Sequence, residues 1–184
     1  MPQPLRAVGS VESTRTAALS LSPSKLSTMK KNETINAVRS VEIRCKKTTN
    51  AVPAVGEISD SLTAAQFARQ FYSDDINIYE SFFLILMNTH NKPIAWAKVA
   101  QGGINEVGVD IMILAKFVVD SLAKNVILVH NHPSGEVNPS QKDKQLTKHV
   151  IDALALLGAK VSDHIILADG IRNYYSFREN NLIY

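Results

Sequence analysis

The stretch VHNHPSGEVNPSQKD, residues 129–143, connects an apolar strand to an amphipathic helix and decides the fold around them. In extended backbone, side chains two residues apart point the same way, with Cα atoms about 6.7 Å apart. His130 and His132 can therefore converge on one metal ion, each with a ring nitrogen about 2.0–2.1 Å from it. Pro133 and Gly135 turn the chain sharply after this pair. The spacing predicts a metal site at the end of a strand.

The second half of the stretch predicts the start of a helix. Ser140 is well placed as its N-cap, which puts Asp143 in the first turn. A carboxylate there points back towards the strand end and could supply a third metal ligand. Three protein ligands leave the fourth tetrahedral position to water, which is the arrangement of a catalytic zinc site. The chain has one cysteine, Cys45, so the metal must be held mainly by nitrogen and oxygen.

Water in such a site needs a general base to take its proton as it attacks a carbonyl. Glu80, near the start of a predicted strand, is the candidate, and the Ser140 hydroxyl could stabilise the developing oxyanion. Each feature alone has an ordinary structural explanation, because histidines often alternate along a strand face and Ser-x-x-Asp commonly caps a helix. Their combination, with a proline after the second histidine, favours the metal site.

Outward from this stretch, hydrophobic periodicity predicts strands mixed with helices. The predicted helices are Ser59–Tyr72, Asp110–Ala123 and Ser140–Leu157, and the predicted strands are Tyr79–Asn88, Pro93–Ala100, Asn125–His130 and Val161–Leu167. A turn at residues 89–92 joins the first two strands into a hairpin. Elements in this order predict an α/β (α+β) sandwich, in which helices pack on one mixed sheet.

Composition divides the chain into three regions. Residues 1–33 are rich in Ser, Thr and Ala and are expected to be a disordered tail. This tail weakly resembles an organelle-targeting peptide, and Met29 offers an alternative start. Residues 34–58 are expected to hold a short strand, with Val38, Val41 and Ile43, and then a linker. Residues 59–184 are expected to form the folded domain.

Charge and hydropathy limit the classes of partner. The net charge is +3 and the pI about 9.0, and much of the excess lies in the first 31 residues. That segment has no aromatic residues to stack on bases, so it is better explained as solvated than as a nucleic-acid contact. No apolar run is long enough to span a bilayer, so no membrane partner is expected. The single thiol fits a reducing compartment, and a cytoplasmic location is expected.

The pattern His-x-His, seven residues, Ser-x-x-Asp, with an upstream Glu, resembles that of the JAMM (JAB/MPN) metalloprotease superfamily. HNHPSG at 130–135, DHII at 163–166 and YYSF at 174–177 are more similar to its RadC-like bacterial branch. The likeness covers roughly residues 59–179. It implies a JAB/MPN-type sandwich, one Zn²⁺ ion, a general base and a transition-state contact. The matching metal ligands are His130, His132 and Asp143, the matching base is Glu80, and the matching transition-state contact is Ser140.

The resemblance also implies a reaction, because relatives in the superfamily cleave peptide or isopeptide bonds, often next to ubiquitin-like modifiers. The predicted function is a zinc-dependent hydrolase acting on a peptide or protein conjugate. Asn131 stands where deubiquitinating relatives usually carry Ser or Thr, which weakens the inference of ubiquitin-type substrates. Glu106 and Glu136 are rival bases, but they lie in predicted loops where the family pattern places none.

Two other functions stay open, together with the oligomeric state. A DNA-repair or mobile-element accessory protein, binding or cutting DNA, would fit the RadC-like resemblance and the basic tail. Residues 1–58 lack the helix-hairpin-helix region of longer RadC proteins. A non-catalytic MPN scaffold is the other alternative, and the intact ligand set argues against it. His164, beside Asp163, could orient a metal ligand or could be a buried histidine with a satisfied hydrogen bond.

Overall fold

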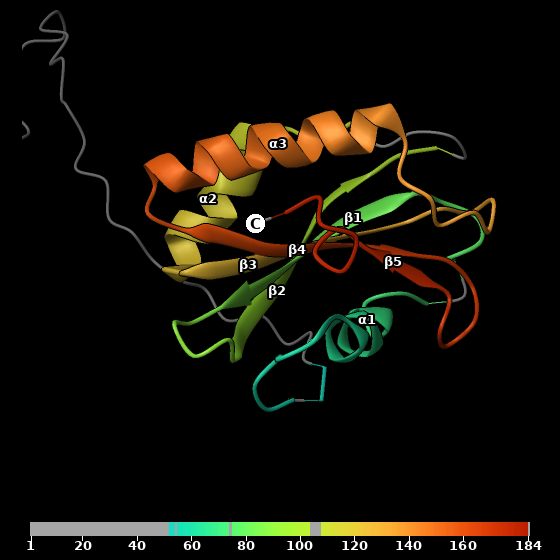
Figure 1. Ribbon diagram of the computed structural model, residues 1–184, viewed down its shortest axis with the longest axis horizontal. Helices are drawn as coiled ribbons and strands as arrows, with labels where there is room; N and C mark the ends of the chain where they lie inside the picture. Colours follow the sequence, from blue (N-terminus) through green and yellow to red (C-terminus); the bar gives the residue numbers. More distant parts are fainter. Residues whose placement is uncertain (1–51, 54, 74, 104–107, 184) are drawn as a thin grey trace, which may run out of the picture. The chain divides into compact units, whose positions relative to one another are not determined.

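The structure is a computed structural model that describes residues 52–53, 55–73, 75–103 and 108–183 (Figure 1). Four expectations concern positions outside the described residues: the disordered tail at 1–33, the strand around residues 38–43, Cys45 and Glu106.

The described residues form a mixed sheet with helices packed on it. The helices are α1 (Ser61–Arg69), α2 (Ile111–Ser121) and α3 (Gln141–Leu156), and the strands are β1 (Ser81–Met87), β2 (Pro93–Gln101), β3 (Asn125–Asn131), β4 (Lys160–Leu167) and β5 (Tyr174–Ser176). The sheet order is β2-β1-β3-β4-β5. Strand β1 is antiparallel to β2 and β3, β3 is parallel to β4, and β4 is antiparallel to β5. The predicted α/β fold, a mixed sheet with a hairpin, is confirmed.

Strand β1 is buried along its whole length, because helices cover both faces of the sheet (Figure 1). Its side chains alternate between two cores, as the period of a strand requires. The core beneath α2 and α3 includes Phe82, Leu84, Leu114, Val118, Leu128 and Leu154. The core on the α1 face includes Ala65, Phe67, Phe83, Ile85, Ile127 and Val129. The sheet is therefore the middle of three layers.

A bulge at Ser162 sets which side chains of β4 reach which layer. Val126 of β3 pairs with Val161, but the next residue, Ile127, pairs with Asp163, so Ser162 is an extra residue. After the bulge, Asp163 contacts α1 and the following residue contacts α3. Without the bulge, each of these two side chains would point to the face opposite the one it occupies here.

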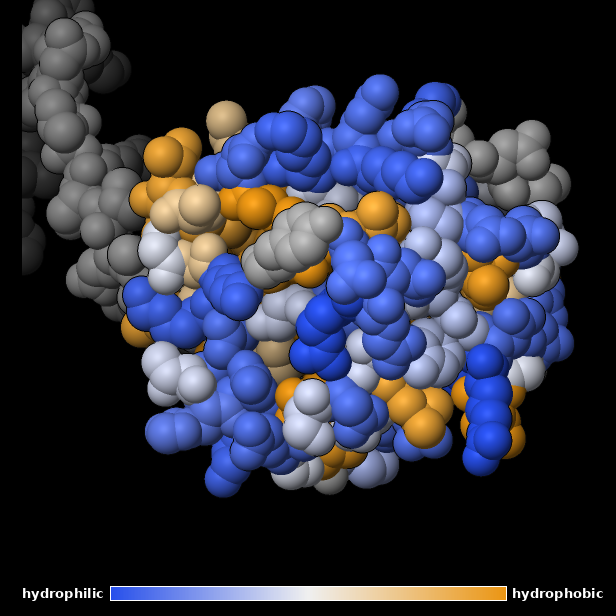
Figure 2. Space-filling view, viewed as in Figure 1, coloured by the Kyte–Doolittle hydropathy of each residue, from blue (hydrophilic) through white to orange (hydrophobic). Residues whose placement is uncertain are grey.

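The outer surface of α3 is hydrophilic, whereas apolar residues gather beside its C-terminal end (Figure 2). Leu156 and Leu157 at this end of α3 are exposed, and so is Leu122 at the C-cap of α2. Within the part of the chain that the structure describes, no helix has the length and apolar character needed to cross a membrane.

Candidate metal centre

His130 and His132 lie at the C-terminal end of β3, on the face covered by α3. Their Nε2 atoms are 2.9 Å apart, as the alternation of an extended strand predicts. The His130 side chain is 1% exposed and that of His132 is 17% exposed. His130 is therefore buried while His132 is partly accessible, which suits a metal ion that must also meet a substrate.

The other ring nitrogens of the pair already face partners. His132 Nδ1 lies 2.6 Å from the carbonyl oxygen of Glu136, which can only accept, so Nδ1 carries the proton. Gly135, at φ +84°, lies in the turn that brings this carbonyl back to the ring. His130 Nδ1 lies 2.8 Å from His164 Nε2. A neutral His132 therefore presents a lone pair at Nε2, facing His130.

Asp143, in the first turn of α3, brings a carboxylate to both rings. Its Oδ1 lies 3.3 Å from His130 Nε2, and its Oδ2 lies 3.7 Å from His132 Nε2. Burial would raise the pKa of Asp143, but its contacts with the two imidazoles and the hydrogen bond from the Ser140 hydroxyl hold it well below its ordinary value. The two Nε2 atoms and this anion converge closely, and such a group needs a cation at its centre, either a proton or a metal ion.

Without a metal ion, the surroundings of His132 favour a proton on its ring. Burial lowers the pKa of His132, but hydrogen bonds to Asp143 and to the Glu136 carbonyl outweigh it, and the pKa lies above its ordinary value. A metal ion entering the site must displace that proton, since only the neutral imidazole is a ligand.

Glu80 brings a second carboxylate to the pair from the start of β1. The candidate ligand atoms of Glu80, His130 and His132 all lie within 4.8 Å of one another. The Glu80 N–H donates to the Gly103 carbonyl at 3.2 Å, and its own carbonyl accepts from the Gly102 N–H at 2.8 Å. These bonds hold its backbone between the ends of the hairpin strands. A carboxylate at this distance can serve as a metal ligand or as a base for water at the centre.

Ser140 joins the centre through Asp143, and its predicted place as N-cap of α3 is confirmed. The Asp143 N–H donates to Ser140 Oγ at 3.2 Å, while the N–H and the hydroxyl of Ser140 both donate to Asp143 Oδ2 at 2.7 Å. The Ser140 hydroxyl proton is therefore directed at the carboxylate. Contact with a substrate oxygen requires the hydroxyl to rotate.

Asn131, between the two histidines, points the other way and binds the backbone around Glu80. Its Nδ2 donates to the carbonyls of Ile76 and Tyr79 at 2.6 and 2.8 Å, and its Oδ1 accepts from the Ser81 N–H at 2.8 Å. Sequence reasoning missed this role. The available signal was a polar side chain at the end of an apolar strand, which must find partners when it is buried.

His164 lies behind His130 and is fully buried. Its Nε2 faces His130 Nδ1, and its Nδ1 lies 2.7 Å from Thr147 Oγ1. The expectation of a buried histidine with satisfied hydrogen bonds is confirmed, and its contact with His130 is the one that the other expectation, of a residue orienting a metal ligand, requires. Burial lowers its pKa well below the ordinary value, so the ring is neutral at pH 7. Sequence reasoning did not single out Thr147.

The other acidic and histidine candidates that the structure describes are engaged or exposed elsewhere. The Glu136 carboxylate accepts hydrogen bonds from the backbone and side chain of Asn138, within its own turn. His90 and His149 are exposed. The structure therefore brings together Glu80 and the residues of the original stretch, and leaves the rival Glu136 carboxylate in its turn.

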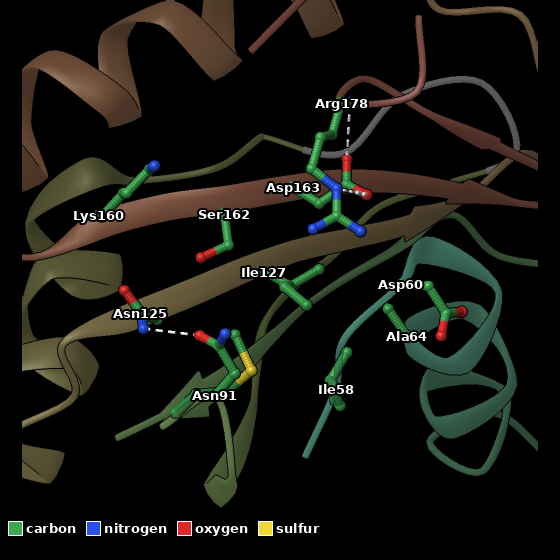
Figure 3. Close-up of a pocket in the computed structure, with 11 residues that line it drawn as sticks. Ile58, Asp60, Ala64, Asn91, Asn125, Ile127, Lys160, Ser162, Asp163 and Arg178 are labelled. Atoms are coloured by element: carbon green, nitrogen blue, oxygen red, sulfur yellow. Dashed lines mark hydrogen bonds and ion pairs between the residues drawn. The ribbon is translucent and has the colours of Figure 1, made fainter. Parts of the chain in front are cut away.

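A polar hollow of about 270 Å³ lies beside α1 (Figure 3). Its polar lining residues include Asp60, Asn91, Asn125, Lys160, Ser162 and Arg178. None of the candidate ligands lines it, and the metal centre lies on the face covered by α3. The polar hollow is therefore separate from the candidate metal centre.

Comparison with known proteins gives a family match over residues 58–182, to the family described as RadC-like JAB domain. The UPF0758 protein of Porphyromonas gingivalis is 32% identical over 149 residues, which are 81% of this chain and 64% of that protein. The UPF0758 protein of Flavobacterium johnsoniae is 40% identical over 104 residues, 56% of this chain and 44% of that protein. UPF0758 protein YfjY of Escherichia coli is 38% identical over 104 residues, 56% of this chain and 64% of that protein.

The chain spans between 44% and 64% of the length of these three relatives. The family match covers more than half of the chain and includes every residue of the candidate metal centre. The resemblance seen in the sequence is confirmed, and the chain belongs to the RadC-like JAB domain family.

Proposed function

We propose that this chain is a zinc-dependent hydrolase of peptide or isopeptide bonds, with one Zn²⁺ held by His130, His132 and Asp143. The observation that supports it best is the meeting of the two Nε2 atoms at 2.9 Å beside the Asp143 carboxylate. Two ligand nitrogens on a tetrahedral zinc ion lie about 3.3 Å apart, given the usual Zn–N distance. Only a small separation of the rings is needed, so the residues present fit the ion.

The surrounding side chains suit amide hydrolysis. A zinc ion held here would polarise a substrate carbonyl and lower the pKa of a water molecule in its open position. Glu80 accepts the proton of the attacking water and returns it to the leaving amine nitrogen. The Ser140 hydroxyl rotates from Asp143 to donate to the carbonyl oxygen as negative charge develops there.

The choice of an amide bond rests on the resemblance to JAMM proteins, which cleave peptide and isopeptide bonds. The proposed substrate is accordingly a peptide or a protein conjugate. A cytoplasmic location is part of the proposal, on the ground of the single thiol.

The test begins with bound metal, measured by elemental analysis after purification without chelators. The wild type is expected to carry close to one zinc per chain, and His132→Ala is expected to lose it. A wild type that takes up no stoichiometric zinc, even after zinc is added back, overturns the proposal. The non-catalytic MPN scaffold would then be the best account.

Glu80→Gln separates a base from a ligand, because the amide cannot accept the proton. This variant is expected to keep its zinc and to lose hydrolysis of labelled casein or of a lysine-isopeptide substrate by roughly 10²–10⁴-fold. Loss of zinc in Glu80→Gln would instead make Glu80 a ligand.

The DNA-accessory alternative makes a different prediction, which is salt-dependent DNA binding. It rests on the RadC-like resemblance and on basic residues in the first 31 positions, which lie outside the described part of the chain. DNA affinity at moderate salt together with no hydrolysis would favour it over the hydrolase.

A further inference from the structure

A line of hydrogen bonds runs from the backbone of α3 to the candidate ligand His130. The Thr147 hydroxyl lies 2.6 Å from the Asp143 carbonyl oxygen and 2.7 Å from His164 Nδ1. His164 Nε2 in turn lies 2.8 Å from His130 Nδ1. Each contact is buried, so each needs one proton between its two heavy atoms.

The chemistry of the first atom in this line fixes every proton along it. A carbonyl oxygen can only accept, so the single hydroxyl proton of Thr147 points at the Asp143 carbonyl. The Thr147 oxygen must then accept from His164 Nδ1–H. A neutral His164 with its proton on Nδ1 has a lone pair on Nε2, which accepts from His130 Nδ1–H. The proton of His130 is thereby held on Nδ1, and its Nε2 is left as a lone pair.

We infer that Thr147 and His164 are positioning residues that hold His130 in the Nδ1–H tautomer, so that its Nε2 is available to the metal. The inference rests on the metal site of the proposed function, but the tautomer it names is a property of the metal-free protein. The outer partner of a ligand histidine is commonly a carboxylate or a backbone carbonyl. Here the outer partner is a second histidine, His164, and the Asp143 carbonyl in α3 decides which of its ring nitrogens carries the proton.

Packing holds the hydrogen-bonded rings of His130 and His164 in place. The His164 ring stacks on Phe177, with ring centroids 4.6 Å apart, and meets the edge of Phe82 at 5.7 Å. Phe82 also stacks on the His130 ring, with centroids 5.9 Å apart. These apolar neighbours oppose a flip of either imidazole, and the full burial of His164 keeps water from replacing its partners. The bulge at Ser162 puts His164 on this face of the sheet.

Without the Thr147 hydroxyl, nothing fixes the tautomers of His164 and His130. In Thr147→Val, His164 Nδ1–H loses its acceptor, so the ring gains by moving its proton to Nε2. That proton would then point at His130 Nδ1 and push the His130 proton onto Nε2, the atom meant for the metal. Thr147→Ser keeps the hydroxyl and is the matched control.

The experiment is NMR on the metal-free, ¹⁵N-histidine-labelled full chain at pH 8, where long-range ¹H–¹⁵N correlations distinguish the two tautomers. Assignment uses single histidine variants at His90 and His149, which lie on the surface. The expected result is the Nδ1–H form for His130 and His164 in the wild type and in Thr147→Ser. A shift of His130 towards the Nε2–H form is expected in Thr147→Val.

Zinc affinity, measured by competition with a chromophoric chelator, gives the second readout. Thr147→Val is expected to bind zinc about 10–100-fold more weakly than the wild type, as for other partners of ligand histidines. Thr147→Ser is expected to restore the affinity. A general loss of packing would not move the tautomer and would not be rescued in this way.

The inference is overturned if wild-type His130 carries its proton on Nε2, or if Thr147→Val matches Thr147→Ser in both tautomer and zinc affinity. The wild-type tautomer needs no variant of Thr147, so this readout decides the matter even where Thr147→Val does not fold. Failure of the proposed function looks different, because a chain that binds no zinc still has a measurable His130 tautomer.

Discussion

At the residue scale, one amide side chain connects the two chain segments that meet at the metal centre. Asn131 lies between the candidate ligands His130 and His132, and its hydrogen bonds go to Tyr79 and Ser81, on either side of Glu80. The strand alternation that points the histidines to one side points Asn131 to the other. The same three residues therefore orient both the candidate metal ligands and the proposed base.

Asn131→Ala is expected to separate metal binding from hydrolysis. It leaves the Ser81 N–H and the Ile76 and Tyr79 carbonyls without their partner, at a cost of about 2–4 kcal/mol in the free energy of unfolding. Zinc content should stay near that of the wild type, while hydrolysis falls because Glu80 is no longer held in place. Loss of zinc in parallel with activity would contradict this role. The measurements are urea unfolding, elemental analysis and peptide hydrolysis.

The pair His132 and Asp143 makes the stability of the metal-free protein depend on pH. The Asp143 pKa is lowered, so its contribution is present above the unfolded value of 3.8 and is lost as the pH falls. The His132 pKa is raised, so its contribution is full below the unfolded value of 6.5 and is lost as the pH rises through the folded value. The pair therefore stabilises the metal-free protein most between about pH 4 and 6.5.

Thermal unfolding in EDTA across pH 4 to 9 checks this window. The wild type is expected to lose stability above pH 6.5, and Asp143→Asn should show little of that loss, because its His132 no longer has an anionic partner. Parallel profiles for the two proteins would rule out the pair as the cause.

At the element scale, the start of α3 has two tasks at one serine. Ser140 caps the helix through its Oγ, and its hydroxyl is also the proposed contact to the substrate oxygen. The two tasks need different features, because the cap needs an acceptor and the contact needs a donor that can turn.

Three substitutions of Ser140 are expected to separate these tasks. Ser140→Ala should cost about 1 kcal/mol in the free energy of unfolding, and Ser140→Asn should cost much less, because asparagine also caps helices well. Both should lower hydrolysis by roughly 10²-fold, since neither keeps the hydroxyl. Ser140→Thr keeps the hydroxyl and serves as control. Full activity in Ser140→Asn would show that the hydroxyl only caps the helix.

The elements that sequence predicts well here are those whose signal is local. The α3 cap and the histidine pair depend on neighbours within a few positions, and both were predicted. Helix α1 is shorter than the predicted Ser59–Tyr72, because Asp60 caps it by accepting from the Thr63 N–H and it ends at Arg69. Strand β5 was not predicted, because its three residues are too few to show a period and depend on pairing with β4.

The same reasoning explains what was missed at the site. The partners of Asn131 lie about fifty positions earlier in the chain, and Thr147 gains its role only where the bulge at Ser162 turns His164 towards α3. Neither arrangement produces a periodic pattern in the amino-acid sequence. Residue type at a local spacing could therefore predict which candidate ligands meet, but not the groups that contact them.

At the scale of the whole molecule, a buried carboxylate ties the α1 layer to the sheet and to the C-terminal segment. Asp163 accepts from the hydroxyls of Ser61 and Ser176 at 2.7 Å each, and from the backbone N–H groups of His164 and Arg178. Hydrogen bonds to a buried charge are among the stronger ones, and removing the charge leaves several donors without their acceptor.

Asp163→Asn is expected to lower the free energy of unfolding by about 3 kcal/mol, because the amide presents one acceptor and two donors to a set of donors. Ser176→Ala removes a single donor and should cost about 1 kcal/mol. Urea unfolding measures both. Equal losses in the two variants would mean that Asp163 does not join the layers.

The Asp143 carboxylate has a consequence for how fast an ion leaves. Its Oδ2 accepts two hydrogen bonds from Ser140 at the start of α3, while its two oxygens face the imidazoles. Fraying of that turn would move the carboxylate away from the rings, and a metal ion held by it would oppose the fraying. The rate at which a metal ion would leave this site would therefore depend on the opening of the helix end, and so on the hydrogen bonds from Ser140 to the carboxylate.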